Sequence, residues 1–320
     1  MPIGLGLAAS HAGAVFATTE EAWDQIWHVL SLSRGVPQPA ANALETGDKL
    51  KDMIARIDAA HKKLTEEFDR YKPDLLIIIG GDQSEMFDRS NVPQLMIFTG
   101  PTAFGAYGGN RQGPEAPQVH TDIDVDYSRY LLKKLVKEEG YDVGFSAELQ
   151  NFGPRGYGLP HAFTRILSYI IDNTKVPTVL IYENTYDPPS LSAKRCYDFG
   201  RTLARITKND PRRIAVFGSG GLAHDPGGKR SGWIDEPLDR WFLDKIASGD
   251  GKATQALYSF DSDAVVGGTG EIRAWITVAG AMEEMGSHGA TVVDYIPAGK
   301  AATGLSMAYW LTKPAMAGAR

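Results

Sequence analysis

One histidine of this sequence stands where α/β proteins usually place their catalytic side chains. His224 closes the segment GSGGLAH (218–224), which follows the largely apolar run 213–217. An apolar run that ends in glycines is typical of a buried strand whose carboxyl end opens into a site. Glycine lets the backbone approach a ligand closely, and histidine suits proton transfer near neutral pH. Taken alone, the segment fits an acid–base site and a glycine turn with an incidental histidine equally well.

Polar side chains also follow other strands that the sequence predicts. His11 comes after the strand 3–9, Asp82 and Gln83 come after 74–81, and Asn184 comes after 176–182. The carboxyl ends of parallel strands meet at one edge of an open sheet, so we expect these side chains to converge on one cleft. His161, at the start of a further helix, could line the same cleft, whereas His28 and His61 are expected on solvated helix faces.

The order of the elements predicts the fold that positions these residues. Helices are expected at about 42–71, 127–140, 194–206, 238–246 and 272–284, between strands at 3–9, 74–81, 176–182 and 213–217. Repeated strand-then-helix order favours an α/β fold with a mostly parallel or mixed central sheet flanked by helices. The polar stretch 105–118 reads as a long loop or a lid. No repeat or linker divides the chain, so we expect a single catalytic domain over 1–320.

Composition excludes several classes of function. With 33 basic and 39 acidic residues the net charge is −6, which disfavours nucleic acid and anionic membrane as partners. A single cysteine, Cys196, leaves no internal disulfide and no cysteine-built metal site. The start of the chain lacks a signal-peptide pattern and no run is long enough to span a membrane, so a cytoplasmic protein is expected. Dinucleotide, P-loop, GxSxG and HExxH motifs are absent.

Taken together, these segments resemble the class III extradiol ring-cleaving dioxygenases, the family of the protocatechuate 4,5-dioxygenase catalytic subunit. The resemblance covers nearly the whole chain. It rests on the order of SH at 10–11, DQ at 82–83, NTYDPP at 184–189, KRC at 194–196, GSGGLAH at 218–224, DRWFLD at 239–244 and IPA at 296–298. The family holds a non-haem Fe(II) with two histidines and one glutamate, which leaves positions open for a catecholate and for O2. The resemblance therefore implies Fe(II), an aromatic substrate and O2.

Carried over residue by residue, the resemblance makes His11 the first iron ligand and His224 the acid–base catalyst. The second histidine of the family is replaced here by Gln83, whose amide oxygen is a weaker donor for Fe(II) than imidazole. The family's glutamate falls on Pro237, so Glu236, one residue earlier, is the expected carboxylate ligand, with a helix-capping role as the alternative. Asp82 or Glu85 could supply a further oxygen.

This altered ligand set leaves three functions open. The first is an extradiol-type dioxygenase acting on a catechol- or gallate-like compound with a modified metal site. The second is a metal-free homologue that uses His224, His11 and Asp82 to hydrolyse, decarboxylate or isomerise an aromatic-derived acid. The third is a non-catalytic binding protein.

The expected substrate contacts lie in the loops around the predicted cleft. They are Asp82, the backbone amides of Gly220 and Gly221, and the side chains of Arg155, Tyr157 and His161. The family's members work with a small partner subunit or as homo-oligomers, so a homodimer and a separate small subunit are both expected arrangements.

Overall fold

A mixed eight-stranded sheet forms the centre of the molecule in the computed structural model, which describes residues 2–32, 39–106, 117–149, 158–170, 175–259, 265–313 and 315. The strand order is β6-β3-β7-β2-β8-β1-β10-β9. The strands are β1 (Ile3–Ala9), β2 (Leu75–Gly80), β3 (Leu95–Phe98), β6 (Gly144–Ser146), β7 (Thr178–Glu183), β8 (Ile214–Ser219), β9 (Ala290–Ala298) and β10 (Thr303–Leu311). β4 (Thr102–Ala106) and β5 (Gln118–Asp122) form a separate antiparallel pair.

The middle of the sheet is parallel, and its two sides are not. β7, β2, β8 and β1 run in the same direction, whereas β3 is antiparallel to β7 and β10 is antiparallel to β1. The central strands are buried throughout, as expected for parallel strands covered on both faces. Their carboxyl ends therefore lie together at one edge of the sheet, as the sequence predicts for an open α/β fold.

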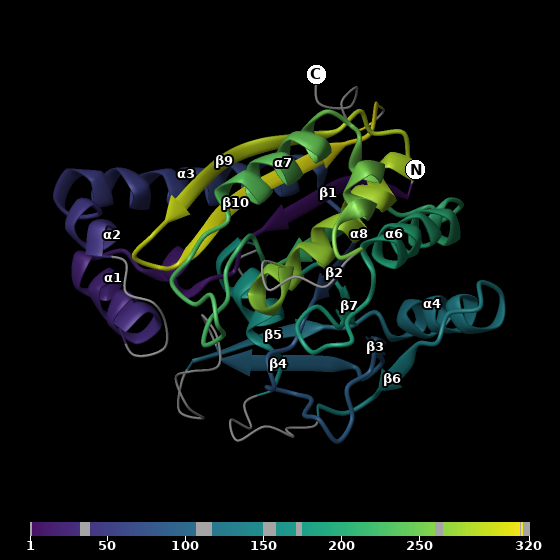
Figure 1. Ribbon diagram of the computed structural model, residues 1–320. Helices are drawn as coiled ribbons and strands as arrows, with labels where there is room; N and C mark the ends of the chain where they lie inside the picture. Colours follow the sequence, from purple (N-terminus) through teal and green to yellow (C-terminus); the bar gives the residue numbers. More distant parts are fainter. Residues whose placement is uncertain are drawn as a thin grey trace.

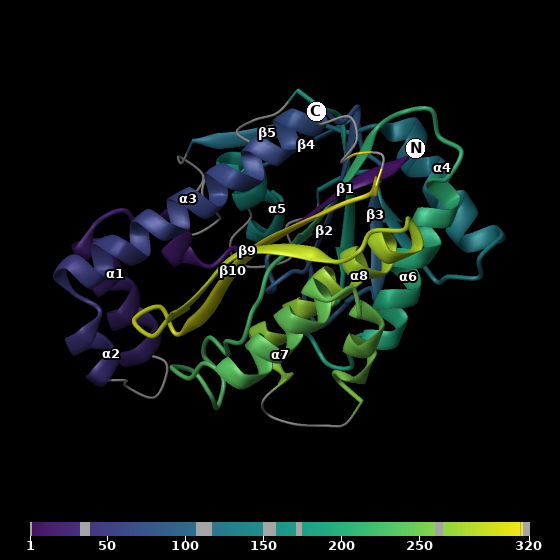
Figure 2. The same cartoon turned by 90° about the horizontal axis from the view of Figure 1, so that it is seen from above.

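Helices cover both faces of the sheet (Figures 1 and 2). Ile77 and Ile79 of β2 point into a core shared with α6 and α8, and the alternate residues Leu76 and Ile78 point into a core shared with α3. The α-helices are α1 (Glu20–Trp27), α2 (Pro39–Leu44), α3 (Gly47–Tyr71), α4 (Val125–Lys137), α5 (His161–Arg165), α6 (Ala193–Thr207), α7 (Glu236–Ala247) and α8 (Ile272–Glu284). Shorter helices are η1 (Gly13–Phe16), η2 (His28–Leu32), η4 (Ile166–Ile170), η5 (Gly251–Ala256) and η7 (Gly267–Glu271).

The predicted α/β architecture is confirmed, and the predicted helices lie within a few residues of α3, α4, α6, α7 and α8. The hairpin of β9 and β10 is an addition that the strand-then-helix pattern does not contain. Of the predicted loop, residues 107–116 lie outside the described part of the chain. Across the described residues, no helix combines the length and the apolar character that a membrane span requires.

One helix face differs from its prediction. α3 buries an apolar stripe that includes Leu50, Ile57 and Leu64, but His61 is also buried, with 3% of its surface exposed. Burial lowers the pKa of His61 to about 3, because the charged imidazolium loses its hydration there. His61 is therefore a neutral core histidine and does not lie on a solvated face.

Candidate active site

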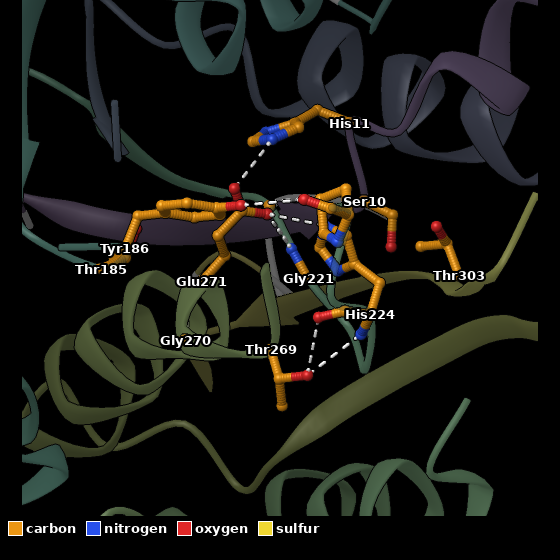
Figure 3. A network of polar contacts seen from close by, with 12 residues as sticks. Ser10, His11, Thr185, Tyr186, Gly221, His224, Thr269, Gly270, Glu271 and Thr303 are labelled. Carbon is orange, nitrogen blue, oxygen red and sulfur yellow. Dashed lines mark hydrogen bonds and ion pairs between the residues drawn. The ribbon is translucent and has the colours of Figure 1, made fainter. Parts of the chain in front are cut away.

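Three strand ends and the start of one helix meet around a single carboxylate. His11 follows β1, Gln83 follows β2 and His224 follows β8, and all three contact Glu271, the last residue of η7 before α8. Figure 3 shows His11 and His224 beside Glu271. His11 Nε2 lies 3.4 Å from Glu271 Oε1, and His224 Nε2 lies 3.7 Å from Glu271 Oε2. Gln83 Nε2 donates to Glu271 Oε1 at 2.9 Å. The convergence expected from the strand ends is therefore present for His11, Gln83 and His224.

Glu271 is buried and ionised. Burial alone would raise the pKa of its carboxyl, but the His11 and His224 rings and the N–H of Gly221 outweigh that effect, and the net pKa lies well below the usual range. Gly221 donates its backbone N–H to Glu271 Oε2 at 2.9 Å. The negative charge of the buried Glu271 carboxylate thus faces two imidazole nitrogens.

The hydrogen bonds around His11 define which of its ring nitrogens carries a proton. Ser219 Oγ donates to the carbonyl oxygen of Ala162 at 2.5 Å, so its only hydrogen is used. It must then accept from His11 Nδ1, which lies 2.8 Å away. In a neutral His11 the remaining nitrogen, Nε2, is unprotonated and carries a lone pair, and it is buried without a hydrogen-bond partner. Since it faces the Glu271 carboxylate, either a proton or a cation is needed between the two groups.

His224 is oriented in the same way by a different set of contacts. Its Nδ1 lies 2.8 Å from the carbonyl oxygen of Leu222, which can only accept, so Nδ1 carries the proton and Nε2 faces Glu271. Thr269 fixes the backbone of His224 by accepting its N–H and by donating to its carbonyl oxygen, both at 3.0 Å. Gly268 leaves room for the ring, because a Cβ at that position would lie 2.2 Å from His224 Nε2.

A second pair of polar residues lies beside His11. Glu85 accepts from the backbone N–H of His161 at 3.0 Å and bonds to its Nδ1 at 2.6 Å. The His161 ring packs edge-on against His11, with 4.6 Å between centroids. Burial lowers the pKa of His161 to about 4, although Glu85 opposes that shift, so the ring is neutral near pH 7. Asp82 supports this arrangement by accepting the N–H groups of the turn after β2, including that of Glu85.

A cavity of about 370 Å³ opens beside these residues. Its polar wall is formed by His11, Gln83, Glu85, His161, Arg165, His224, Asp225 and Thr303. The opposite wall belongs to η1, α1 and η2, and Ala301 and Ala302 from the turn between β9 and β10 complete it. The cavity is large enough for a substituted aromatic ring, and the nitrogens that could act on that ring are at its polar end.

Several predicted site residues make contacts that differ from the roles predicted for them. Glu236 is the half-buried first residue of α7, where it pairs with Arg240, and the carboxylate beside His11 is Glu271 instead. Gly220 and Gly221 do not offer free amides, since their N–H groups donate to Ala9 and to Glu271.

Asp82 and Asn184 are not among the described residues that line the cavity. Asp82 binds its own turn, and Asn184 bonds to Asp187 in the turn after β7. Arg155 and Tyr157 lie outside the described residues.

Sequence reasoning missed Glu271 because it stands directly before an apolar helix, where an acidic residue is ordinary. A usable signal was the segment GGTGE at 267–271, in which glycines again precede a polar residue. Gly221 and Glu271 come together because the start of α8 packs against the end of β8. The two residues are far apart in the sequence, so local patterns do not reveal the contact.

The cluster fits a divalent cation, although its donor set is weak. Two ligands of one metal ion at right angles are roughly 3 Å apart, which is near the 3.4 Å between His11 Nε2 and Glu271 Oε1. Gln83 turns its Nε2 toward Glu271, so its amide must rotate by half a turn to offer its oxygen to the same ion. His11 and Glu271 are strong donors, and the amide of Gln83 is a weaker one. Within the described ranges, no three His, Cys, Asp or Glu side chains form a metal-binding group, and the Gln83 amide is the candidate third ligand that contacts Glu271 there.

Fold and site together define an α/β protein with a candidate metal-assisted acid–base centre at the carboxyl ends of its strands. The family model described as the catalytic LigB subunit of aromatic ring-opening dioxygenase matches residues 38–306. The chain belongs to this family, which confirms the resemblance found from the sequence.

Three relatives are named 2,3-dihydroxyphenylpropionate/2,3-dihydroxicinnamic acid 1,2-dioxygenase. The chain is 25% identical to the Azotobacter vinelandii protein over 176 residues (55% of this chain, 51% of the relative) and 28% identical to the Rhodococcus jostii protein over 180 residues (56% and 52%). It therefore spans about half the length of these two relatives. The match to the Burkholderia vietnamiensis protein is 23% identical over 295 residues and covers 78% of this chain and 87% of the relative.

Among solved structures, an uncharacterised protein of Escherichia coli K12 matches with a TM-score of 0.49 and 12% identity, over 96% of this chain and 99% of that one.

Proposed function

We propose that this chain is an extradiol-type ring-cleaving dioxygenase with an altered metal site, acting on a catechol- or gallate-like compound. Fe(II) would be held by His11, Glu271 and the amide of Gln83. The observation that carries this proposal is the buried Nε2 of His11, which has no hydrogen-bond partner and faces an ionised carboxylate at 3.4 Å. Family membership supports the same chemistry.

Each residue of the site has a part that its contacts explain. When bound, the metal supplies a Lewis acid that acidifies a catechol hydroxyl and a centre at which O2 can react. His224 holds its Nδ1 proton on Leu222, so its Nε2 is available to accept a proton from a substrate hydroxyl and to return it later. His161, oriented by Glu85, presents its ring to the cavity and would hydrogen-bond a polar group of the substrate.

The test is an oxygen-uptake screen on protein loaded with Fe(II) without oxygen, using catechols and gallate. We expect about one iron per chain and O2 consumption that needs both the iron and the aromatic compound. His224→Ala should keep the iron and lose most of the turnover, because it removes the proton acceptor and leaves the ligands in place. Less than about a tenth of an equivalent of iron after loading would contradict the proposal, since even a weak metal site should fill under excess metal.

A second function has its own support in the structure. Both oxygens of Glu271 already accept N–H groups, from Gly221 and from Gln83, so the carboxylate is satisfied without a metal. A proton on His11 Nε2 would complete a buried ion pair, and His224 with His11 could then perform metal-free acid–base chemistry on an aromatic-derived acid. Turnover of such a compound that persists in the presence of a strong chelator would favour this alternative.

The setting of the protein is part of the proposal. We propose a cytoplasmic enzyme with one catalytic domain over 1–320 that works as a homodimer or with a separate small subunit. Size-exclusion chromatography with light scattering on the purified chain distinguishes the two arrangements, because a homodimer forms without any added partner.

A further inference from the structure

The cavity continues from the polar cluster into an apolar alcove. We define the alcove by the apolar side chains that residues 14–30 contribute to the cavity wall: Ala14, Phe16, Ala17, Ala22, Ile26, Val29 and Leu30. Gln25 of α1 is the one polar side chain among the described lining residues of this stretch. Three of the seven apolar residues are alanines, which leave space where larger residues would fill it. A cavity of about 150 Å³ holds a benzene ring. The 370 Å³ found here therefore leaves more than half of its volume for a substituent on the ring.

The wall that forms the alcove is fixed to the rest of the protein. Trp23 of α1 is fully buried, and its Nε1–H donates to the carbonyl oxygen of Ala17 at 2.9 Å. The ammonium of Lys300, in the turn between β9 and β10, pairs with Asp24 of α1 at 2.5 Å. These contacts hold α1 against the turn that supplies Ala301 and Ala302 to the cavity, so the alcove is a built part of the site.

The charges around the cavity argue against an acidic substituent. Among the described lining residues Arg165 is the only lysine or arginine, and it donates to the carbonyl oxygen of His11 while its guanidinium lies 5.6 Å from the centre of the Phe16 ring. Two carboxylates, Glu85 and Asp225, line the same space. Within the described part of the wall, an anionic group on the substrate would meet two negative charges for one positive charge, and the lining side chains between positions 14 and 30 are hydrocarbon apart from Gln25.

We infer that the substrate is a catechol-class ring that carries a neutral, apolar substituent, and that the alcove binds this substituent. The inference rests on the proposed function for the ring and its hydroxyls. It departs from the relatives named above, whose names describe acids. Burial of each methylene group strengthens binding about fourfold, so a four-carbon chain that enters the alcove should produce a large effect.

Binding of inert phenols to the full chain tests this inference without metal or oxygen. Equilibrium dialysis compares phenol, 4-butylphenol and 3-(4-hydroxyphenyl)propanoate on the metal-free protein. We expect 4-butylphenol to bind at least about tenfold more tightly than phenol and than the propanoate. Equal or tighter binding of the propanoate would overturn the inference, and so would a failure of 4-butylphenol to bind. A failure of the proposed ring cleavage would be seen in oxygen uptake and would leave these affinities unchanged.

Substitutions in the alcove test whether the butyl group of 4-butylphenol binds there. Ala17→Leu should remove most of the advantage of 4-butylphenol by filling the space, and Ile26→Lys should reverse the preference in favour of the propanoate. Val136→Lys is the matched control, because Val136 is 40% exposed on α4 and does not line the cavity. Thermal unfolding of each variant identifies those that fold. An advantage of 4-butylphenol that survives in a folded Ala17→Leu or Ile26→Lys protein would place the substituent elsewhere and overturn the inference.

Discussion

Replacing Gly268 by alanine tests whether the position of the His224 ring matters. A Cβ at Gly268 would lie 2.2 Å from His224 Nε2 and 2.4 Å from two carbons of the ring. Ordinary contacts of a Cβ begin at about 3.4 Å, so the ring must move by roughly 1 Å. The backbone of Gly268 is not in the left-handed region, so alanine itself is acceptable there. A displacement of about 1 Å at a catalytic group can lower turnover roughly 100-fold.

The assay is steady-state oxygen uptake of the iron-loaded Gly268→Ala protein with a catechol. We expect kcat to fall about 100-fold while the iron content stays at the wild-type value, because His11, Gln83 and Glu271 are not displaced. Gly144→Ala is the control, since its Cβ would meet only ordinary contacts of 3.5 Å or more in β6. Wild-type turnover in Gly268→Ala, with the folded state verified by circular dichroism, would refute the role of the His224 ring in proton transfer.

Three further predictions concern the metal ligands and the core. Gln83→His should raise the affinity for Fe(II) at least about tenfold in an anaerobic titration, since imidazole is the stronger donor, and unchanged affinity would exclude this side chain as a ligand. Ser219→Ala should lower that affinity about 10- to 100-fold, because Ser219 accepts from His11 Nδ1 and fixes the ring; a loss below threefold would count against this orienting role. His61 stays neutral in the fold with a pKa of about 3, against about 6.5 unfolded, so acidification below about pH 6.5 protonates the unfolded chain first and stability is lost toward pH 3. Between pH 7.5 and pH 5, the free energy of unfolding measured with denaturant should fall by about 2 kcal/mol less in His61→Leu than in the wild type. The substitution His288→Leu, at an exposed position, should leave the wild-type fall unchanged.

The sequence predicts the scaffold of the site better than its chemistry. In the sequence, the carboxyl ends of β1, β2 and β8 appear as apolar runs followed by polar residues. This pattern is sufficient to predict that His11, Gln83 and His224 lie close together. It works because parallel strands place their ends at one edge of the sheet whatever the rest of the fold does.

The carboxylate could not be predicted by the same reasoning. The family pattern favours Glu236 by its position, yet this residue is half-buried at the start of α7 and pairs with Arg240. Glu271 precedes the buried helix α8, and its contact with Gly221 depends on how that helix packs against β8. Contacts between elements distant in the sequence are set by packing, which local periodicity does not report. For the same reason, local patterns do not report that α1 lines the cavity.

The central claim is that His11, Gln83 and Glu271 hold one iron ion. An anaerobic Fe(II) titration of the wild type beside Glu271→Gln and Glu236→Gln tests it most directly. We predict one bound iron in the wild type and in Glu236→Gln, and none in Glu271→Gln at the same metal concentration. A wild type that binds no iron, or iron binding that survives in Glu271→Gln, would contradict the account.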